Sequence, residues 1–104
     1  MTGRLFYLQP RGAVLSAVSD LAELQNGKFT FSDTRNGIIH FMVKLYHNKW
    51  EFRFLVRDTG KNTSCVELEI DGDDERAESL ISREYALLEA MLIENLKVEI
   101  VSNA

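Results

Sequence analysis

Residues 38–57 read Ile38-Ile-His-Phe-Met-Val-Lys-Leu-Tyr-His-Asn-Lys-Trp-Glu-Phe-Arg-Phe-Leu-Val-Arg57, and this stretch decides the fold. Large apolar side chains recur at every second position in two runs, Ile39, Phe41, Val43 and Leu45 and then Trp50, Phe52, Phe54 and Val56. Successive side chains of a β-strand point to opposite faces of the sheet, so a period of two predicts strands with one apolar face. Between the runs, His47 and Asn48 suit a two-residue turn, which predicts an antiparallel hairpin.

The same period continues on both sides of this hairpin. Residues 28–33 alternate around Phe29 and Phe31, and residues 63–70 form a further apolar run. Turns are predicted at residues 34–37 and 58–62, where Gly37 and Gly60 permit unusual backbone angles. A turn at His47-Asn48 sets a register in which inward residues meet inward residues and opposite charges meet outside. The predicted pairs are Leu45 with Trp50, Val43 with Phe52, Phe41 with Phe54, Phe54 with Val66, Phe52 with Leu68, Trp50 with Ile70, Lys44 with Glu51 and Arg53 with Glu67.

Two amphipathic helices are predicted, one before and one after the meander in the sequence. Residues 11–25 repeat apolar side chains every three or four positions, and Asn26-Gly27 suits a left-handed helix end. Asp73 or Asp74 can cap a longer helix that runs to about residue 95. Short strands are expected at residues 4–9 and 97–101. The predicted fold is one α+β domain over residues 1–104, with a four- to five-stranded antiparallel meander, an N-terminal helix and a long C-terminal helix packed on one face.

Composition restricts the classes of partner. The 104 residues carry a formal net charge of −4, and the 45% hydrophobic and 27% charged residues are ordinary values for a globular domain. An acidic chain does not favour nucleic acid or an anionic membrane surface, because both attract basic faces. A single cysteine cannot form an internal disulfide, and no apolar stretch at the N-terminus resembles a secretion signal. We therefore expect a cytoplasmic protein that binds neither nucleic acid nor membranes.

Glu84 is the first candidate for a functional side chain. It falls within the apolar stripe of the C-terminal helix, four residues from both Leu80 and Leu88. A carboxylate in such a place must be paired, hydrogen-bonded, protonated or beside water. One interpretation is a pocket carboxylate that orients a ligand between the sheet and the helix. The other, which we favour, is that the stripe is slightly rotated, or that Glu84 lies at its edge and reaches Arg83, Arg76 or solvent.

The aromatic side chains of the meander also admit two interpretations. They line a cavity for an apolar ligand, or they interdigitate in a solid core, which is the commoner arrangement in a small domain. The set comprises Phe29, Phe31, Phe41, Trp50, Phe52 and Phe54. If a cavity forms, the expected ligand-binding residues are Trp50, Phe52, Phe54, Glu84 and Met91.

The outer face of the sheet is the second candidate site. In the predicted register it brings together a patch of Met42, Leu55, Cys65 and His40 across three strands, among charged residues. Scattered apolar residues are normal on a surface, but a contiguous patch is a feature of protein interfaces. The patch therefore predicts self-association or another protein partner at this face.

No residue pattern indicates catalysis, a metal or a cofactor. His40 and His47 have no second histidine or cysteine at the spacing of zinc ligands. Asp71, Asp73 and Glu75 superficially resemble a calcium loop, but the glycine is out of register, and helix capping explains the acids better. The sequence has no nucleophile–base pair or phosphate-binding loop, so we expect a non-enzymatic protein with no cofactor and no metal.

Four stretches carry a resemblance to a known family. They are Gly27-Lys-Phe-Thr-Phe-Ser-Asp33, Gly37-Ile-Ile-His-Phe-Met-Val43, Lys49-Trp-Glu-Phe-Arg-Phe-Leu-Val-Arg57 and Thr63-Ser-Cys-Val-Glu-Leu-Glu-Ile70. Followed by the helix from Asp74, they resemble the meander and gripping helix of small bacterial START and Bet v 1-like proteins, the helix-grip fold. The resemblance is one of pattern and transfers no catalytic residue. The chain is shorter than the family pattern, with a single helix before the meander, and cystatin-like and secretion-chaperone folds share the same pattern.

Two functions follow from these observations. The first is a non-enzymatic protein-interaction or accessory module that uses the outer sheet face, with a second copy or another protein as partner. The alternative comes from the helix-grip resemblance, which implies a small apolar-ligand binding protein with a pocket between the sheet and the C-terminal helix. Trp50 and Glu84 would lie at that pocket.

Overall fold

The computed structural model describes the backbone of residues 1–102 and the side chains of residues 1–93. It confirms the predicted α+β class, with a five-stranded antiparallel sheet, an N-terminal helix and a C-terminal helix. The elements are β1 (Thr2–Tyr7), α1 (Arg11–Leu24), β2 (Lys28–Asp33), a 3-10 turn (Thr34–Asn36), β3 (Ile38–Leu45), β4 (Asn48–Gly60), β5 (Thr63–Glu69) and α2 (Glu75–Ser102).

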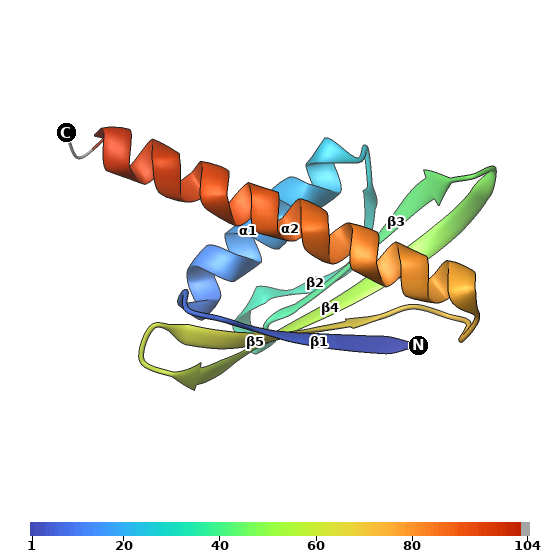
Figure 1. Ribbon diagram of the computed structural model, residues 1–104, viewed down its shortest axis with the longest axis horizontal. Coiled ribbons are helices and arrows are strands. Elements are labelled where there is room, and N and C mark those ends of the chain that lie inside the picture. Colours follow the sequence, from blue (N-terminus) through green and yellow to red (C-terminus); the bar gives the residue numbers. More distant parts are fainter. Residues whose placement is uncertain (103–104) are drawn as a thin grey trace.

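The sheet has the strand order β1-β5-β4-β3-β2. Strands β2 to β5 form the predicted meander, and β1 joins its far edge by pairing antiparallel with β5. The backbone of Met1 extends this pairing, because its nitrogen donates to the carbonyl of Ile70 at 2.8 Å and its carbonyl accepts from the Ile70 amide at 3.0 Å. Figure 1 shows both helices on the same side of the sheet, with α2 crossing α1.

The β3–β4 hairpin turns one residue earlier than predicted. Tyr46 and His47 both have positive φ, at 54° and 67°, which is the backbone of a tight turn whose twist matches the two strands. The pairs therefore shift by two residues, to Val43 with Trp50, Phe41 with Phe52 and Ile39 with Phe54. The predicted pairing of Lys44 with Glu51 is wrong, since Lys44 lies opposite Lys49. A shift of two keeps every side chain on its predicted face.

The β4–β5 pairing also shifts by two residues, but here because the turn comes later in the chain than predicted. Phe54 lies opposite Leu68 and Val56 opposite Val66, so the predicted pairs of Phe54 with Val66 and Phe52 with Leu68 are wrong. Outside the core, Arg53 faces Glu69 rather than Glu67. The cause is the length of β4, which continues to Gly60 and carries the turn further along the chain than the predicted strand end at residue 57.

The core is filled by side chains of the sheet and of both helices. The ring of Phe41 stacks on Phe54 at a centroid distance of 5.7 Å and lies tilted against Phe52 at 5.7 Å, and all three are buried. From α1 the buried side chains are Val14, Leu15, Ala17, Val18, Leu21 and Ala22, and from α2 they are Ala77, Leu80, Ile81, Glu84, Tyr85, Leu88 and Leu92. These three rings therefore belong to the solid-core interpretation of the aromatic set.

Phe29 and Phe31 do not share a face, in contrast to their predicted alternation. The pairing of β2 with β3 shifts between these two residues, so Phe29 lies opposite Phe41 and Phe31 opposite His40. Such a bulge inserts one extra residue, here Thr30, and reverses the side on which the next side chain lies. Phe31 therefore belongs to the outer face, where it is 50% exposed.

The C-terminal helix begins as predicted and ends later. The Asp74 carboxylate accepts a hydrogen bond from the Ala77 amide at 3.0 Å, which confirms one of the two predicted caps. The helix continues to Ser102, so the strand expected at residues 97–101 is wrong. Residues 96–102 contain no glycine or proline, so no helix-breaking residue interrupts this stretch. Within the described residues, no helix is long and apolar enough to cross a membrane.

Gly37 provides a direct test of how closely β3 approaches β4. Its φ is +74°, and an added Cβ would overlap the carbonyl oxygen of Val56, whose own amide donates to the Gly37 carbonyl at 2.8 Å. We expect Gly37→Ala to lower the free energy of unfolding by about 1–3 kcal/mol, because it adds backbone strain and a steric overlap. Gly12→Ala is the matched control, since the methyl group that it adds to α1 would meet nothing within 4 Å. Urea unfolding should show no loss for Gly12→Ala, and equal losses for both variants would contradict this account.

Candidate functional site

The outer face of the sheet, turned away from both helices, carries outward side chains of all five strands. The strand register arranges these side chains in rows that cross the sheet. The central row is Thr2, Glu69, Arg53, His40 and Phe31, and the next is Arg4, Glu67, Leu55, Ile38 and Asp33. The apolar side chains of these rows are Phe31 on β2, Ile38 on β3 and Leu55 on β4, whereas β5 and β1 contribute mostly charges.

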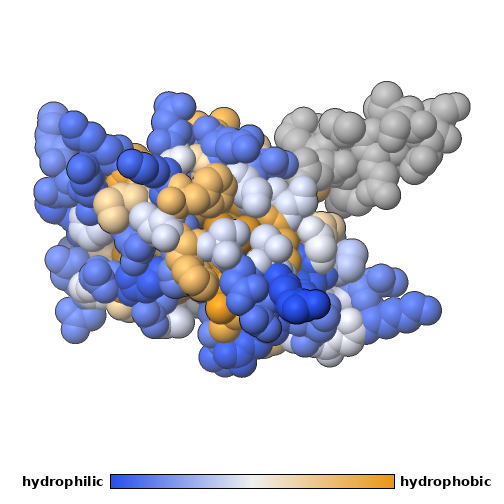
Figure 2. Space-filling view, turned by 180° about the vertical axis from the view of Figure 1, so that it is seen from behind, coloured by the Kyte–Doolittle hydropathy of each residue, from blue (hydrophilic) through white to orange (hydrophobic). Residues whose placement is uncertain are grey.

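A hollow of about 280 Å³ lies on this face. It is lined by Thr2, Phe31, Ile38, His40, Arg53, Phe54, Leu55, Glu67 and Glu69. Phe31 is half exposed at its rim, and its ring lies 5.4 Å from that of His40. Figure 2 views the molecule from behind, with the helices above the sheet as in Figure 1, and shows apolar residues in the middle of that side with hydrophilic residues around them. We name the apolar part of this site, Phe31, Ile38 and Leu55, the outer hollow.

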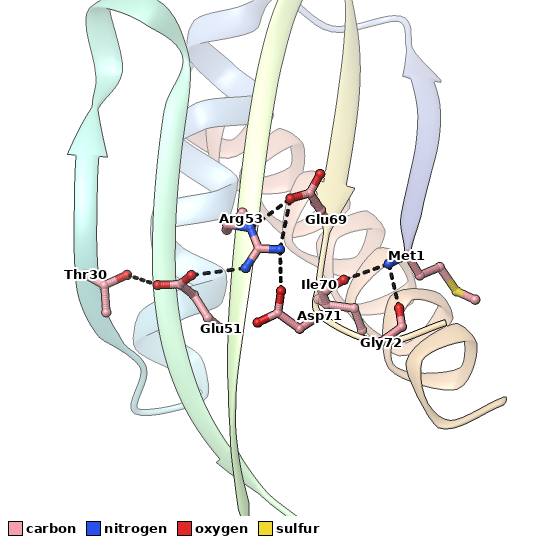
Figure 3. A network of polar contacts seen from close by, with 8 residues as sticks. All are labelled: Met1, Thr30, Glu51, Arg53, Glu69, Ile70, Asp71 and Gly72. Carbon is pink, nitrogen blue, oxygen red and sulfur yellow. Dashed lines mark hydrogen bonds and ion pairs between the residues drawn. The ribbon is translucent and has the colours of Figure 1, made fainter. Parts of the chain in front are cut away.

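Arg53 organises the charges beside the outer hollow (Figure 3). Its guanidinium donates to Glu51 at 3.1 Å, to Glu69 at 2.9 Å and to Asp71 at 3.1 Å, and Thr30 donates to the other oxygen of Glu51 at 2.9 Å. The hydrogen bonds from Thr30 and then from Arg53 lower the pKa of Glu51. Partial burial acts to lower the pKa of Arg53, but its bonds to the three carboxylates raise it overall. Glu51 and Arg53 therefore stay ionised at neutral pH.

A second charge cluster lies further along the same face, with the signs reversed. Glu67 accepts from Arg4 at 2.7 Å and lies 3.8 Å from the guanidinium of Arg57. Both arginines are well exposed, at 59% and 62% of their side chains. Phe6 and Cys65 form the neighbouring cross-strand pair. This cluster has two cations around one carboxylate, whereas the Arg53 cluster has three carboxylates around one cation.

The four residues predicted to form an interface all lie on the outer face, but they are not equally available. Met42, Leu55 and His40 are partly exposed, and Leu55 and His40 line the hollow. Cys65 is buried, with Phe6 and Arg57 as its cross-strand neighbours, so it offers little contact surface. The sequence analysis placed Phe31 with the inward aromatic residues and so did not include it on the outer face. The side chain of Phe31 points outward because the strand pairing shifts around Thr30, and no residue type in residues 28–33 predicts that shift.

Glu84 is fully buried at the junction of α1 and α2, where it is held by two neighbours. Its carboxylate accepts from the Gln25 side-chain amide at 2.6 Å and from the Arg83 guanidinium at 2.6 Å. Arg83 also donates to the Gln25 carbonyl oxygen at 2.6 Å, which closes the group of three. Burial raises the pKa of Glu84, although Gln25 and Arg83 act in the opposite direction. Of the two interpretations of Glu84, these contacts correspond to the one in which it reaches Arg83.

The other predicted ligand-binding residues are dispersed. Phe52 and Phe54 lie within the core, and Phe54 also borders the outer hollow. Trp50 and Met91 are partly buried at the periphery of the core, and the Trp50 indole donates to the Leu45 carbonyl at 3.3 Å. Their role toward a ligand stays a prediction. Among the described residues, no group of three or more His, Cys, Asp and Glu side chains is placed to hold a metal ion.

Comparison with known proteins establishes the fold and no more. No family model matches the chain, and no curated protein matches its sequence. One similar solved structure is a chain from the adenylate sensor of AMP-activated protein kinase, crystallised with the nucleotide ZMP. It is 12% identical, the match covers 86% of this chain and 94% of that chain, and the TM-score is 0.62. At this identity the similarity is one of architecture alone.

Two further solved structures are similar to this chain at lower TM-scores. The di-domain ARO/CYC StfQ from the steffimycin biosynthetic pathway is 13% identical over 88% of this chain and 42% of that chain, with a TM-score of 0.46. A START superfamily protein from Mycobacterium smegmatis is 11% identical over 100% of this chain and 98% of that chain, with a TM-score of 0.39. Both TM-scores are below 0.5, so neither structure supports an argument about this chain.

Arg53 should contribute to stability through its three carboxylates. In Arg53→Met, the carboxylates of Glu51, Glu69 and Asp71 lose their shared cation and repel one another. We expect the free energy of unfolding to fall by about 1–3 kcal/mol at low salt and by less at high salt, because salt screens the repulsion. Arg57→Met is the control, since its guanidinium is exposed and should change stability by less than about 0.5 kcal/mol. Urea unfolding at two salt concentrations checks this, and a salt-independent loss would argue against it.

Glu84 should give the protein a specific pH dependence. Because its pKa is raised in the folded state, the folded protein binds this proton more tightly than the unfolded chain does. Its contribution to the free energy of unfolding therefore falls as pH rises from the ordinary glutamate pKa through the raised one. Relative to wild type, Glu84→Gln should gain stability across that window. Glu78→Gln changes an exposed side chain on the same helix and is the control. Urea unfolding at a series of pH values should give it a curve of unfolding free energy against pH that is parallel to that of wild type. Parallel curves for all three proteins would refute this account.

Proposed function

We propose that the protein is a non-enzymatic interaction module that binds a protein partner through the outer face of its sheet. The observation that carries this proposal is the outer hollow, in which Phe31, Ile38 and Leu55 present apolar surface beside two ordered charge clusters. Protein interfaces combine an apolar centre with a polar rim in this way. The volume of the hollow, about 280 Å³, lies just below the range of about 300–1,000 Å³ that drug-sized ligands occupy. A group of the size of one large side chain of a partner is therefore the better fit.

The space between the sheet and the C-terminal helix is less suited to binding. Phe41 contacts Phe52 and Phe54 on the inner face of the sheet beneath α1, and α1 contributes six buried side chains to this core, so α1 occupies the space that such a pocket would need. Glu84, the candidate carboxylate of a pocket, has its oxygens bonded to Gln25 and Arg83. The alternative function, an apolar ligand held between the sheet and α2, would need some of this packing to open. It predicts a change in Trp50 fluorescence when apolar ligands are added, whereas the interaction module predicts none.

The charges next to the outer hollow favour a protein over a nucleic acid. Each cation of the two clusters lies beside a carboxylate, with distances from 2.7 to 3.8 Å. A surface that neutralises phosphates needs unopposed cations, and the whole chain has a net charge of −4. Mixed charges around an apolar centre suit a partner whose own surface is equally mixed.

Photo-crosslinking in the cells from which the protein comes tests this proposal. We expect benzoyl-phenylalanine at position 31 to give a discrete protein adduct, because Phe31 lies at the rim of the outer hollow. The same probe at Leu24 is the control, since Leu24 is 56% exposed, close to the 50% of Phe31, but lies at the end of α1. The Phe31 adduct should be lost when Leu55→Glu is added, with the fold checked by circular dichroism. Equal adducts at both positions, or none at position 31, would rule out the outer face as the binding surface.

A further inference from the structure

β1 is an edge strand, and one side of its backbone has no partner strand. Within residues 1–102 it lies at one end of the strand order and pairs only with β5. Met1 and Ile70 bond to each other through both backbone groups, and such pairs recur at every second residue of an antiparallel ladder. The residues between these pairs therefore direct their N–H and C=O groups away from β5. We name these groups the free edge; they belong to Thr2, Arg4 and Phe6.

β1 lacks the features that commonly keep an edge strand from pairing, which are a proline, a bulge or a protruding charge. It pairs with β5 in an unbroken register and contains no proline. Its one charged side chain, Arg4, is bonded to Glu67 of β5 at 2.7 Å. The opposite edge strand, β2, differs because its pairing shifts between Phe29 and Phe31, and a bulge interrupts the regular spacing of backbone groups. β1 is therefore the edge to which a further strand fits.

The inner side of β1 is held in place by α2. The Tyr85 hydroxyl lies 2.8 Å from the Gly3 carbonyl of β1 and 3.1 Å from the Val66 carbonyl of β5. A Cβ added to Gly3 would come within 2.7 Å of Ile81, so α2 packs closely on this strand. A strand that is already fixed in the extended conformation loses little conformational entropy when another segment pairs with it.

Two large apolar side chains are exposed at β1. Phe6 is 70% exposed and Leu8, just after the strand, is 88% exposed, the two highest values among the large hydrophobic residues that the structure describes. A hollow of about 200 Å³ adjoins Phe6, and its charged lining residues are Arg4, Arg57, Asp58 and Glu67. Two guanidiniums and two carboxylates balance there, so the partner is selected by apolar contact and backbone pairing.

We infer that β1 is a second interaction site, at which an extended apolar segment of another protein pairs antiparallel with the free edge and covers Phe6 and Leu8. Backbone donors and acceptors at every second residue are matched in full by another extended backbone. The antiparallel direction is the more stable one and is that of every other pair in the sheet. This inference is independent of the outer hollow, because it concerns an edge of the sheet and not its face.

The size of the edge favours a flexible segment over a second folded copy. Six residues extend about 20 Å, and a sheet with its side chains is about 10 Å thick, so two rigid domains meeting edge to edge bury on the order of 200 Å² per copy. The total of about 400 Å² is well below the ~1,200–2,000 Å² of stable interfaces. A flexible segment is not limited in this way, because beyond the free edge it can also bend over Phe6 and Leu8.

Backbone N-methylation tests the inference, since it removes a donor of the free edge and keeps every side chain. Cys65 permits it, because a synthetic peptide of residues 1–64 can be ligated to a chain that begins with this cysteine. The probe is a phage library of random twelve-residue peptides selected on wild type. Enriched peptides should carry apolar residues at alternate positions without proline between them, and should bind N-methyl-Phe6 at least about tenfold more weakly than wild type.

The matched control is N-methyl-Ser32 on the opposite edge. The Ser32 amide faces away from the sheet, because Ser32 lies opposite Ile39 and the backbone groups of Ile39 are directed to β4. This protein should bind the peptides as wild type does. Phe6→Ser keeps the backbone intact and should weaken binding at least about fivefold, so the inference stays testable if N-methyl-Phe6 does not refold. Circular dichroism checks the fold of each protein.

The outcomes decide between three occupants of the edge. Equal binding by wild type, N-methyl-Phe6 and Phe6→Ser, or no enriched peptide, overturns β1 as a binding site. A concentration-dependent dimer in sedimentation velocity that N-methyl-Phe6 abolishes assigns the edge to a second copy and overturns the segment of another protein. The proposed function is judged by the Phe31 adduct and is not affected by any of these results.

Discussion

The packing of Phe41 against Phe52 and Phe54 is the constraint on which the other features of the structure depend. These rings fill the inner face of the sheet beneath α1, and their burial fixes which side chains of β3 and β4 point inward. A slip of one residue would turn all three toward water, at about 2–3 kcal/mol each. Because folding occupies the inner face, any recognition by a face of the sheet falls to the outward residues between them, such as Arg53 and Leu55.

The sequence predicted the features that depend only on residue type and period. The inward faces of β3, β4 and β5, the amphipathic helices and the cap at Asp74 follow from local patterns, and the structure contains each of them. The contact of Glu84 with Arg83 was also foreseeable, since a buried carboxylate needs a partner and Arg83 is adjacent. Gln25 was not foreseen as the other partner, because it comes from α1, 59 residues away in the chain.

Features that depend on the alignment of strands were not predictable in the same way. Two neighbouring dipeptides could form the β3–β4 turn, and both keep the apolar residues inward. In the structure the turn is formed by Tyr46 and His47, which both have positive φ, although Asn48 is better suited to positive φ than either. The bulge at Thr30 is likewise not indicated by any residue type in the sequence, yet because of it the side chain of Phe31 points to the outer face and not to the core.

The charge pattern of the outer face is a consequence of that alignment. In the register predicted from the sequence, Arg53 would lie opposite Glu67, and the three carboxylates would not share one guanidinium. The observed shift of two residues sets Arg53 opposite Glu69 and within reach of Asp71, and it leaves Glu67 to Arg4 and Arg57. A shift of two leaves the core face unchanged, so burial of the apolar face alone does not select between the two registers. The turn between β4 and β5, which sets this register, therefore also places Arg53 among three carboxylates and Glu67 beside two guanidiniums.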